Sequence, residues 1–147
     1  LQGDEPLIKP ESIDEVAKNV KFDETADIST LIRKITPAEA ENPNLVKCIV
    51  NCNGFAMYFS RSKIPFERNQ GKAEFFGHLG IYGYKRDALI KMTELPQSTY
   101  EQAESLEQLR ALQNGMTIKT SVVDFVPVGI DTAEDLKRFK NIVAHSA

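Results

Sequence analysis

The sequence predicts an α/β fold in which helices pack against a mixed β-sheet. Short apolar runs alternate along the chain with stretches of helical spacing, which is typical of α/β domains. One strong hairpin signal, Asn53-Gly54, interrupts this alternation and requires an antiparallel pair. No internal repeat or low-complexity tract occurs. The 147 residues therefore fit a single domain, 1–147, whose core needs no disulfide.

The first half of the chain contains one long helix, an isolated strand and the hairpin. In order, we expect a helix from Pro10, a strand over 27–35, a short helix from Thr36, hairpin strands over 46–50 and 56–59, and a loop over 62–71. Pro10 suits a first helical position, and apolar residues follow it at helical spacing (Ile13, Val16, Ala17 and Val20). Thr36-Pro37-Ala38-Glu39 is a capping box, which predicts a helix start.

The second half contains two strands separated by helices. In order, we expect a strand over 77–84, a short helix over 86–92, a helix from Ser98 to Gly115, a strand over 118–126 and a last helix from Thr132. A second capping box opens the helix at Ser98, and Gly115 is a natural helix end. This helix carries an inward stripe at helical spacing (Ala103, Leu106, Leu109 and Leu112).

Charge and cysteine content exclude several classes of protein. The net charge of −3 argues against non-specific binding of nucleic acid. No apolar run approaches the roughly 20 residues that a membrane-spanning helix needs. Cys48 and Cys52 lack the second Cys/His pair of a zinc site, and a disulfide between them would be an odd link within one hairpin. We interpret both as reduced packing thiols of a cytoplasmic protein.

Two acidic turns are the first candidates for chemistry. Asp4 lies in Gln2-Gly3-Asp4-Glu5-Pro6, which resembles the end of a strand opening into a loop, and Asp131 follows the strand over 118–126. If those strands are neighbours, both carboxylates project from one edge of the sheet. Two carboxylates suit Mg²⁺, which takes few protein ligands. The alternative is ordinary turn and helix-cap chemistry, which Asp also favours.

The strand over 77–84 is the second candidate. If it is regular, one face carries His78, Gly80, Tyr82 and Tyr84. Such a face has room for a polar ligand and hydrogen-bonding groups to line it. A lone histidine is more often a satisfied structural residue than a catalyst, but the composition of this face leaves both interpretations open.

Arg61, Glu107 and Gln108 are weaker candidates by themselves. Arg61 ends the apolar run over 56–60, and a guanidinium can hold a carboxylate or phosphate by two parallel hydrogen bonds. An ordinary charge at a strand end is the alternative. Glu107 and Gln108 fall outside the leucine stripe of their helix, which also fits solvated helix surface.

Six segments taken together resemble one known family. They are Gln2-Gly3-Asp4-Glu5-Pro6, Asn42-Pro43-Asn44-Leu45-Val46-Lys47, Tyr58-Phe59-Ser60-Arg61 with Ile64-Pro65, residues 78–84, residues 104–110 and residues 129–135. In this order they resemble 3-deoxy-manno-octulosonate cytidylyltransferase, or CMP-Kdo synthetase, from Leu1 to about Lys140. Enzymes of that family couple CTP to the eight-carbon acid sugar Kdo, release pyrophosphate and supply CMP-Kdo for lipopolysaccharide.

The resemblance implies a fold and a cofactor. The fold is a three-layer, Rossmann-like nucleotidyltransferase with a mixed, mostly parallel sheet, and this chain would be its C-terminal portion. The N-terminal loop that wraps the CTP phosphates in the family is absent, so we expect the isolated chain to be inactive. Asp4 and Asp131 match the catalytic carboxylates that bind Mg²⁺ in the family.

The resemblance also assigns substrate contacts and an assembly. The positions that match Kdo contacts are Arg61, His78, Tyr82, Glu107 and Gln108, and Gln2 matches a glutamine beside the nucleotide. A homodimer is implied, for which the hairpin over 56–59 with Phe75 and Phe76 is a candidate contact surface.

Three alternative functions remain open at this point. A cytidylyltransferase for another acid sugar, such as a sialic acid, would share the metal chemistry, but the Kdo-type contact set argues against it. A metal-dependent phosphohydrolase could use the same two aspartates and would release phosphate without a sugar acceptor. A non-catalytic fragment that serves only as a dimerisation unit would assemble without turnover.

Overall fold

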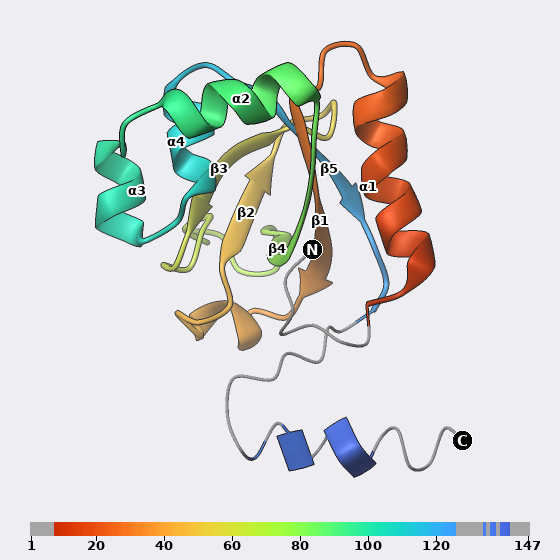
Figure 1. Ribbon diagram of the computed structural model, residues 1–147. Coiled ribbons are helices and arrows are strands. Elements are labelled where there is room, and N and C mark those ends of the chain that lie inside the picture. The colour runs from red at the N-terminus through yellow and green to blue at the C-terminus, as the bar shows by residue number, and fades with distance from the viewer. Residues whose placement is uncertain (1–7, 126–133, 135, 138, 142–147) are drawn as a thin grey trace.

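The computed structural model describes residues 8–125, 134, 136, 137 and 139–141 (Figure 1). Its elements are α1 (Pro10–Phe22), β1 (Ile28–Ile35), η1 (Glu39–Glu41), β2 (Lys47–Val50), β3 (Ala56–Ser60), β4 (Phe75–Tyr84), α2 (Arg86–Glu94), α3 (Thr99–Glu104), α4 (Gln108–Gln113) and β5 (Ile118–Val122). Three predicted site residues, Gln2, Asp4 and Asp131, lie outside the described residues.

The five strands form one mixed sheet in the order β3-β2-β4-β1-β5. Among the described strands only β1 and β5 pair in parallel, whereas β1–β4, β2–β3 and β2–β4 are antiparallel. The expectation of a mostly parallel sheet is therefore wrong for the described part of the chain. The reason is the hairpin β2–β3: it lies between β1 and β4 in the sequence, and β4 then returns beside β1 in the opposite direction.

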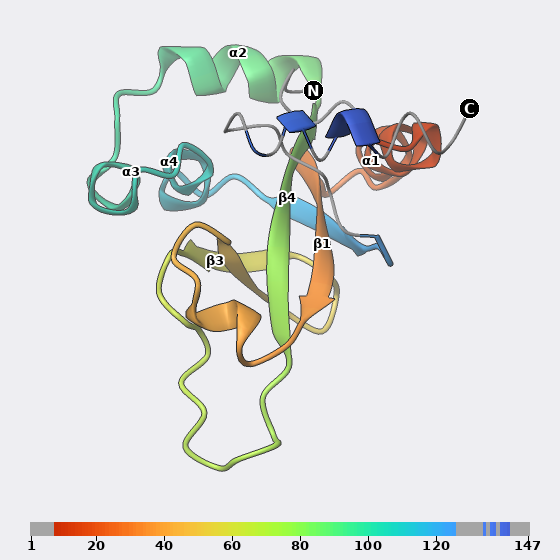
Figure 2. The same cartoon turned by 90° about the horizontal axis from the view of Figure 1, so that it is seen from below.

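Helices cover both faces of the sheet, which confirms the predicted three layers (Figure 2). On one face α1 packs its Val16 against Leu31 of β1 and Leu79 and Ile81 of β4. The larger core on the other face joins β1, β2 and β3 to α2 and to the segment from Leu106 to Met116. Alternate residues of β1 thus face opposite layers, as the two-residue period of a strand requires.

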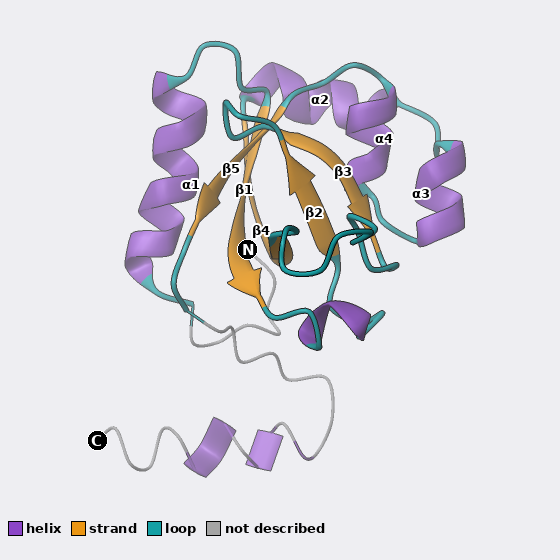
Figure 3. Ribbon diagram, turned by 180° about the vertical axis from the view of Figure 1, so that it is seen from behind, coloured by secondary structure: helices purple, strands orange, loops and turns teal. Residues whose placement is uncertain are grey.

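The helix predicted from Ser98 to Gly115 is two helices, α3 and α4. The chain breaks at Ser105, which adopts a left-handed conformation with φ 53°. The capping box at Ser98 is confirmed, because its hydroxyl accepts from the Glu101 amide and the Glu101 carboxylate accepts from the Ser98 amide. Of the predicted inward stripe, Leu106 and Leu109 are buried and Leu112 is partly buried, but Ala103 is exposed, and the stripe contained no signal for the break. Figure 3 shows α4 beside β3.

Among the described residues, the predicted turns and helix starts form, but two elements are shorter than expected. The hairpin is confirmed, with Gly54 at φ 76° in its turn. The capping box at Thr36 forms, but it opens only the short 3-10 turn η1. The last strand ends at Val122, earlier than predicted. Much of the predicted last helix lies outside the described residues. Within the part of the chain that the structure describes, no helix is long and apolar enough to span a membrane.

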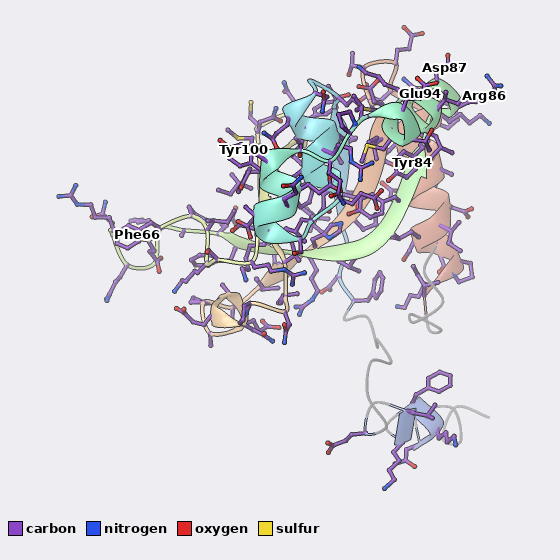
Figure 4. All side chains as sticks on the ribbon, turned by 60° about the vertical axis from the view of Figure 1, so that its left-hand side comes forward. Phe66, Tyr84, Arg86, Asp87, Glu94 and Tyr100 are labelled. Atoms are coloured by element: carbon purple, nitrogen blue, oxygen red, sulfur yellow. The ribbon has the colours of Figure 1, made fainter. Side chains whose placement is uncertain are left out.

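Half of the surface suggested for a dimer is buried within the chain itself. Ala56, Phe59 and Phe75 belong to the protein's own core, whereas the other three residues of that surface are partly or strongly exposed. Within the apolar run over 56–59, Met57 is the one strongly exposed residue. The most exposed large apolar side chain of the described residues is Phe66, which projects from the loop between β3 and β4 (Figure 4).

Candidate functional site

Arg61 follows the end of β3 and is held in place by backbone carbonyls. Its Nε donates to the carbonyl of Glu104 at 2.8 Å, and its two terminal nitrogens lie 3.3 Å from the carbonyl of Pro43 and 3.5 Å from that of Ser105. No carboxylate within the described part of the chain forms an ion pair with this guanidinium. Its orientation is therefore fixed while its positive charge stays without a counter-ion, which suits an anionic ligand.

Glu104 and Lys47 support this arrangement from behind. The Glu104 carboxylate accepts from the Ser60 hydroxyl at 2.6 Å and from the Arg61 backbone amide at 2.9 Å, so it ties the end of α3 to the end of β3. The Lys47 ammonium is buried and donates to the carbonyls of Asn42 and Arg61. Burial lowers the pKa of Lys47, while the nearby Glu104 carboxylate opposes that shift.

His78 and Tyr82 lie together on β4, as the alternation predicted. Their ring centroids are 5.3 Å apart, and Tyr84 continues the row at 6.0 Å from Tyr82. The rings of Phe59 and His78 meet in a T-shaped arrangement with their centroids 5.1 Å apart. Phe59 precedes Arg61 by two residues, so this contact links His78 to the end of β3. Burial lowers the pKa of His78 to about 4 and raises that of Tyr82, so both side chains are neutral at pH 7.

Glu107 and Gln108 stand at the start of α4 and differ sharply in exposure. The Glu107 side chain is 71% exposed and lies 3.8 Å from Arg110. Its carboxylate is close enough to Tyr82 and Tyr84 to help raise the pKa of both phenols, after the larger effect of burial. Gln108 is only 7% exposed, and its amide has no hydrogen bond to any described residue. It is available to a ligand.

The structure joins the five predicted Kdo contacts through two short links. The α3–α4 turn carries Glu107 and Gln108, and its Ser105 carbonyl touches Arg61. Strand β3 carries Phe59, which touches His78. Residues 61, 78, 82, 107 and 108 therefore belong to one region on the α2–α4 side of the sheet. Solvated helix surface describes Glu107 but not the buried Gln108.

Three residues of this region escaped the sequence reasoning: Thr30, Lys47 and Glu104. Each acts on a partner far along the chain, with Thr30 at 2.9 Å from His78 and Glu104 at 2.9 Å from the Arg61 amide. Glu104 and Lys47 both lie inside the segments that carried the family resemblance, which was the only available signal.

The predicted metal site cannot be built from the described residues, since Asp4 and Asp131 lie outside them. Elsewhere in the described ranges, no group of three or more His, Cys, Asp or Glu side chains is arranged to hold a metal ion. The Cys48 thiol is free and buried, and burial raises its pKa to about 12, which makes it unreactive. Cys52 is also free but exposed, because it lies in the hairpin turn, so the prediction of a packing thiol is wrong for it.

A sequence model of the family described as cytidylyltransferase matches residues 1–118. The chain belongs to the cytidylyltransferase family. It is 43% identical over 144 residues to 3-deoxy-manno-octulosonate cytidylyltransferase of Escherichia coli, covering 98% of this chain and 58% of that protein. The enzyme of the same name from Thermodesulfovibrio yellowstonii is 47% identical over 144 residues, which cover 93% of this chain and 56% of the relative.

A solved structure agrees with these relatives. The structure of CMP:2-keto-3-deoxy-manno-octonic acid synthetase complexed with CTP superposes with a TM-score of 0.96 and 42% sequence identity. It covers 100% of this chain and 61% of the solved chain. The cytidylyltransferase chain described here is thus a homologue of CMP-Kdo synthetase that spans about three fifths of the length of these relatives.

Proposed function

We propose that this chain provides the Kdo-binding side of a CMP-Kdo synthetase, which transfers CMP from CTP to Kdo and releases pyrophosphate. The observation that carries the proposal is Arg61, a guanidinium fixed by three carbonyls and without a counter-ion among the described residues, in the same region as the neutral pair His78 and Tyr82. An acid sugar offers one carboxylate and several hydroxyls, which match a cation and neutral hydrogen-bonding groups respectively.

The proposed reaction is an in-line displacement at the α-phosphorus of CTP. The anomeric hydroxyl of Kdo forms the new oxygen–phosphorus bond, loses its proton and displaces pyrophosphate. Little covalent chemistry is required of the protein, so its main contribution is to position the sugar. Arg61 would orient the Kdo carboxylate, while His78, Tyr82, Glu107 and Gln108 would fix the hydroxyls. A histidine with a pKa of about 4 is a weak base, which supports a binding role for His78.

Mg²⁺ belongs to the proposal through Asp4 and Asp131. Two carboxylates are a suitable donor set for this hard cation, which fills its remaining positions with water and phosphate oxygens. When bound, the ion would neutralise phosphate charge during the displacement. Gln2 is proposed to lie beside the nucleotide. We further propose a homodimer and a cytoplasmic location, for which a reduced, buried Cys48 is suitable.

The alternatives differ from this proposal in what they bind. A phosphohydrolase needs no carboxylate-binding cation such as Arg61. A dimerisation unit needs no row of neutral polar side chains such as His78 and Tyr82. A sialic-acid enzyme would bind a carboxylate as well, so substrate competition has to decide between the two sugars.

A reconstitution experiment tests the proposed reaction. The chain is co-expressed with the part of the Escherichia coli relative that it does not match, and pyrophosphate release is measured. We expect release that requires CTP, Kdo and Mg²⁺ together, and none from this chain alone. Phosphate release without Kdo would support the phosphohydrolase instead. Equal rates with N-acetylneuraminate would contradict the Kdo assignment. A folded, stoichiometric complex without turnover would contradict the enzymatic proposal.

A further inference from the structure

The hydroxyl of Thr30 in β1 lies within hydrogen-bonding distance of three polar atoms of β4. Its hydroxyl oxygen is 2.9 Å from His78 Nε2, 2.7 Å from the carbonyl oxygen of Ile81 and 3.2 Å from that of Leu79. Thr30 is completely buried. The β1–β4 register shifts here: Thr30 pairs with Tyr82 and Leu31 with Leu79, so that Gly80 and Ile81 form a bulge that the hydroxyl fills.

The hydroxyl has one proton, and its neighbours decide where that proton goes. A carbonyl oxygen only accepts hydrogen bonds, so the contact of 2.7 Å with Ile81 requires a hydrogen between the two oxygens. The Thr30 proton is therefore used on the backbone and is not donated to His78. For the contact of 2.9 Å to be a hydrogen bond, His78 must donate its Nε2–H to the Thr30 oxygen.

The other ring nitrogen is then free to accept. A neutral imidazole carries one proton, so a proton on Nε2 leaves a lone pair on Nδ1. Nδ1 has no hydrogen bond to any described residue. Every fully buried side-chain nitrogen or oxygen in that part of the chain does have a partner, so Nδ1 retains access to solvent or to a ligand.

We propose that Thr30 is a positioning residue that fixes His78 as the Nε2–H tautomer, so that Nδ1 accepts a hydrogen bond from a sugar hydroxyl. In this arrangement the Arg61 guanidinium can only donate and receives the carboxylate, whereas Nδ1 of His78 can only accept and rejects it. The two side chains therefore impose one orientation on an acid sugar. The role in sugar binding rests on the proposed function, but the tautomer does not.

Histidine NMR on the whole 147-residue chain tests the tautomer directly. The sequence has two histidines, so ¹⁵N-histidine labelling gives two ring systems, and His145→Gln identifies His78. At pH 7 we expect the long-range ¹H–¹⁵N pattern of a ring protonated on Nε2. A ring protonated on Nδ1, or a doubly protonated ring, would overturn the proposal.

Two substitutions of Thr30 connect the tautomer to sugar binding. Thr30→Val keeps the shape but removes the hydroxyl, and we expect the His78 signals to move toward a mixture of tautomers. Thr30→Ser keeps the hydroxyl and should restore the wild-type pattern. Kdo affinity should fall about five- to tenfold in Thr30→Val, because one hydrogen bond to the sugar is lost or weakened. It should recover in Thr30→Ser.

The two kinds of failure are distinguishable. An unchanged His78 pattern in folded Thr30→Val would overturn the assignment of Thr30. A changed tautomer with wild-type Kdo affinity would overturn its positioning role. If the wild-type chain shows the Nε2–H pattern but binds no Kdo, the proposed function is wrong and the tautomer assignment stands on the NMR result.

Discussion

Three arginines of the described residues differ in the partners that hold their guanidinium groups. Arg110 is almost buried and forms an ion pair with Glu101, and Arg33 pairs with Glu39. Within the part of the chain that the structure describes, the Arg61 guanidinium is held by carbonyls alone. Burying and pairing a charge serves the fold, whereas fixing a charge without pairing it serves a ligand. The distinction rests on the side chain's partners, which the sequence does not reveal.

Arg61→Lys should weaken Kdo binding while CTP binding stays nearly unchanged. A lysine keeps the charge, but it has no planar fork and is unable to hold three carbonyls and a carboxylate at once. In the reconstituted enzyme we expect KM for Kdo to rise at least tenfold, a loss of about 1.4 kcal/mol. Arg33→Lys is the matched control and should leave both KM values unchanged. Equal damage to both substrates by Arg61→Lys would show that the side chain is structural or touches the nucleotide.

His78 should make stability depend on pH in a window that lies mostly above that of the Glu39 carboxylate. Its pKa in the folded protein is about 4, below the ordinary value of 6.5. Between these values the unfolded chain binds more protons, so the free energy of unfolding falls as the pH falls from 6.5 to 4. The pKa of Glu39 is lowered from 4.5 to about 2, so the stability that this carboxylate contributes is lost as the pH falls between those two values.

Urea unfolding at several pH values measures this effect. The difference in unfolding free energy between wild type and His78→Gln should change between pH 6.5 and pH 4 and be constant above pH 7. His145→Gln is the control for the second histidine. A constant difference across the whole range would contradict a His78 that stays neutral in the folded protein.

Some residues of the site could be placed from the sequence pattern, and others could not. Alternation placed His78 and Tyr82 on one face, and the structure confirms this. It left open whether His78 is structural or functional, because the deciding partner, Thr30, lies 48 residues away and is brought close by an unforeseen bulge. The roles of Arg61, Glu107 and Gln108 came from the family resemblance, and they stay predictions.

At the scale of elements, the break between α3 and α4 shapes the site. The leucine stripe runs through the break without change of period, so periodicity predicted a single helix. The cause lies outside the stripe: Glu104 turns its carboxylate toward Ser60 and Arg61, and Ser105 takes a left-handed conformation. This break lets the Ser105 carbonyl reach Arg61. Hydrogen bonds between distant elements thus overruled the local pattern.

Glycine should be tolerated at Ser105 and harmful two residues earlier. A left-handed residue other than glycine costs about 1–2 kcal/mol, so Ser105→Gly should leave the free energy of unfolding within about 1 kcal/mol of wild type or raise it. Ser105→Val should lower it by about 1–2 kcal/mol. The matched control is Ala103→Gly within α3, which should lower it by about 1 kcal/mol. If Ser105→Gly destabilised as much as Ala103→Gly, position 105 would be helical and the break would be wrong.

At the scale of the whole molecule, sheet order brings the site together. The order β3-β2-β4-β1-β5 places the hairpin beside β4, so that Phe59 meets His78 and Arg61 follows at the strand end. The sequence predicted the strands and the hairpin, and the three layers follow from their faces. It did not predict the pairing, because strand order depends on contacts between segments that are far apart in the chain.

The two aspartates at opposite ends of the chain should act as a unit. If Asp4 and Asp131 share one Mg²⁺, replacing either by Asn should remove most activity of the reconstituted enzyme. The double replacement should cost little more than the worse single one, because both act through one ion. The fold should survive, since two carboxylates without metal repel one another. Near-normal turnover of Asp131→Asn at saturating Mg²⁺, with the fold intact by circular dichroism, would contradict the shared metal.

Direct titration of Kdo into this chain tests the central claim that its described residues form a Kdo site. Chemical shifts of ¹⁵N-labelled backbone amides are followed as Kdo is added, with N-acetylneuraminate as the competing acid sugar. We predict saturable changes that include Arg61, His78, Tyr82 and Gln108, a marked loss of affinity in Arg61→Lys, and weaker binding of N-acetylneuraminate. Changes confined to other parts of the chain, or equal binding of both sugars by wild type and Arg61→Lys, would contradict it.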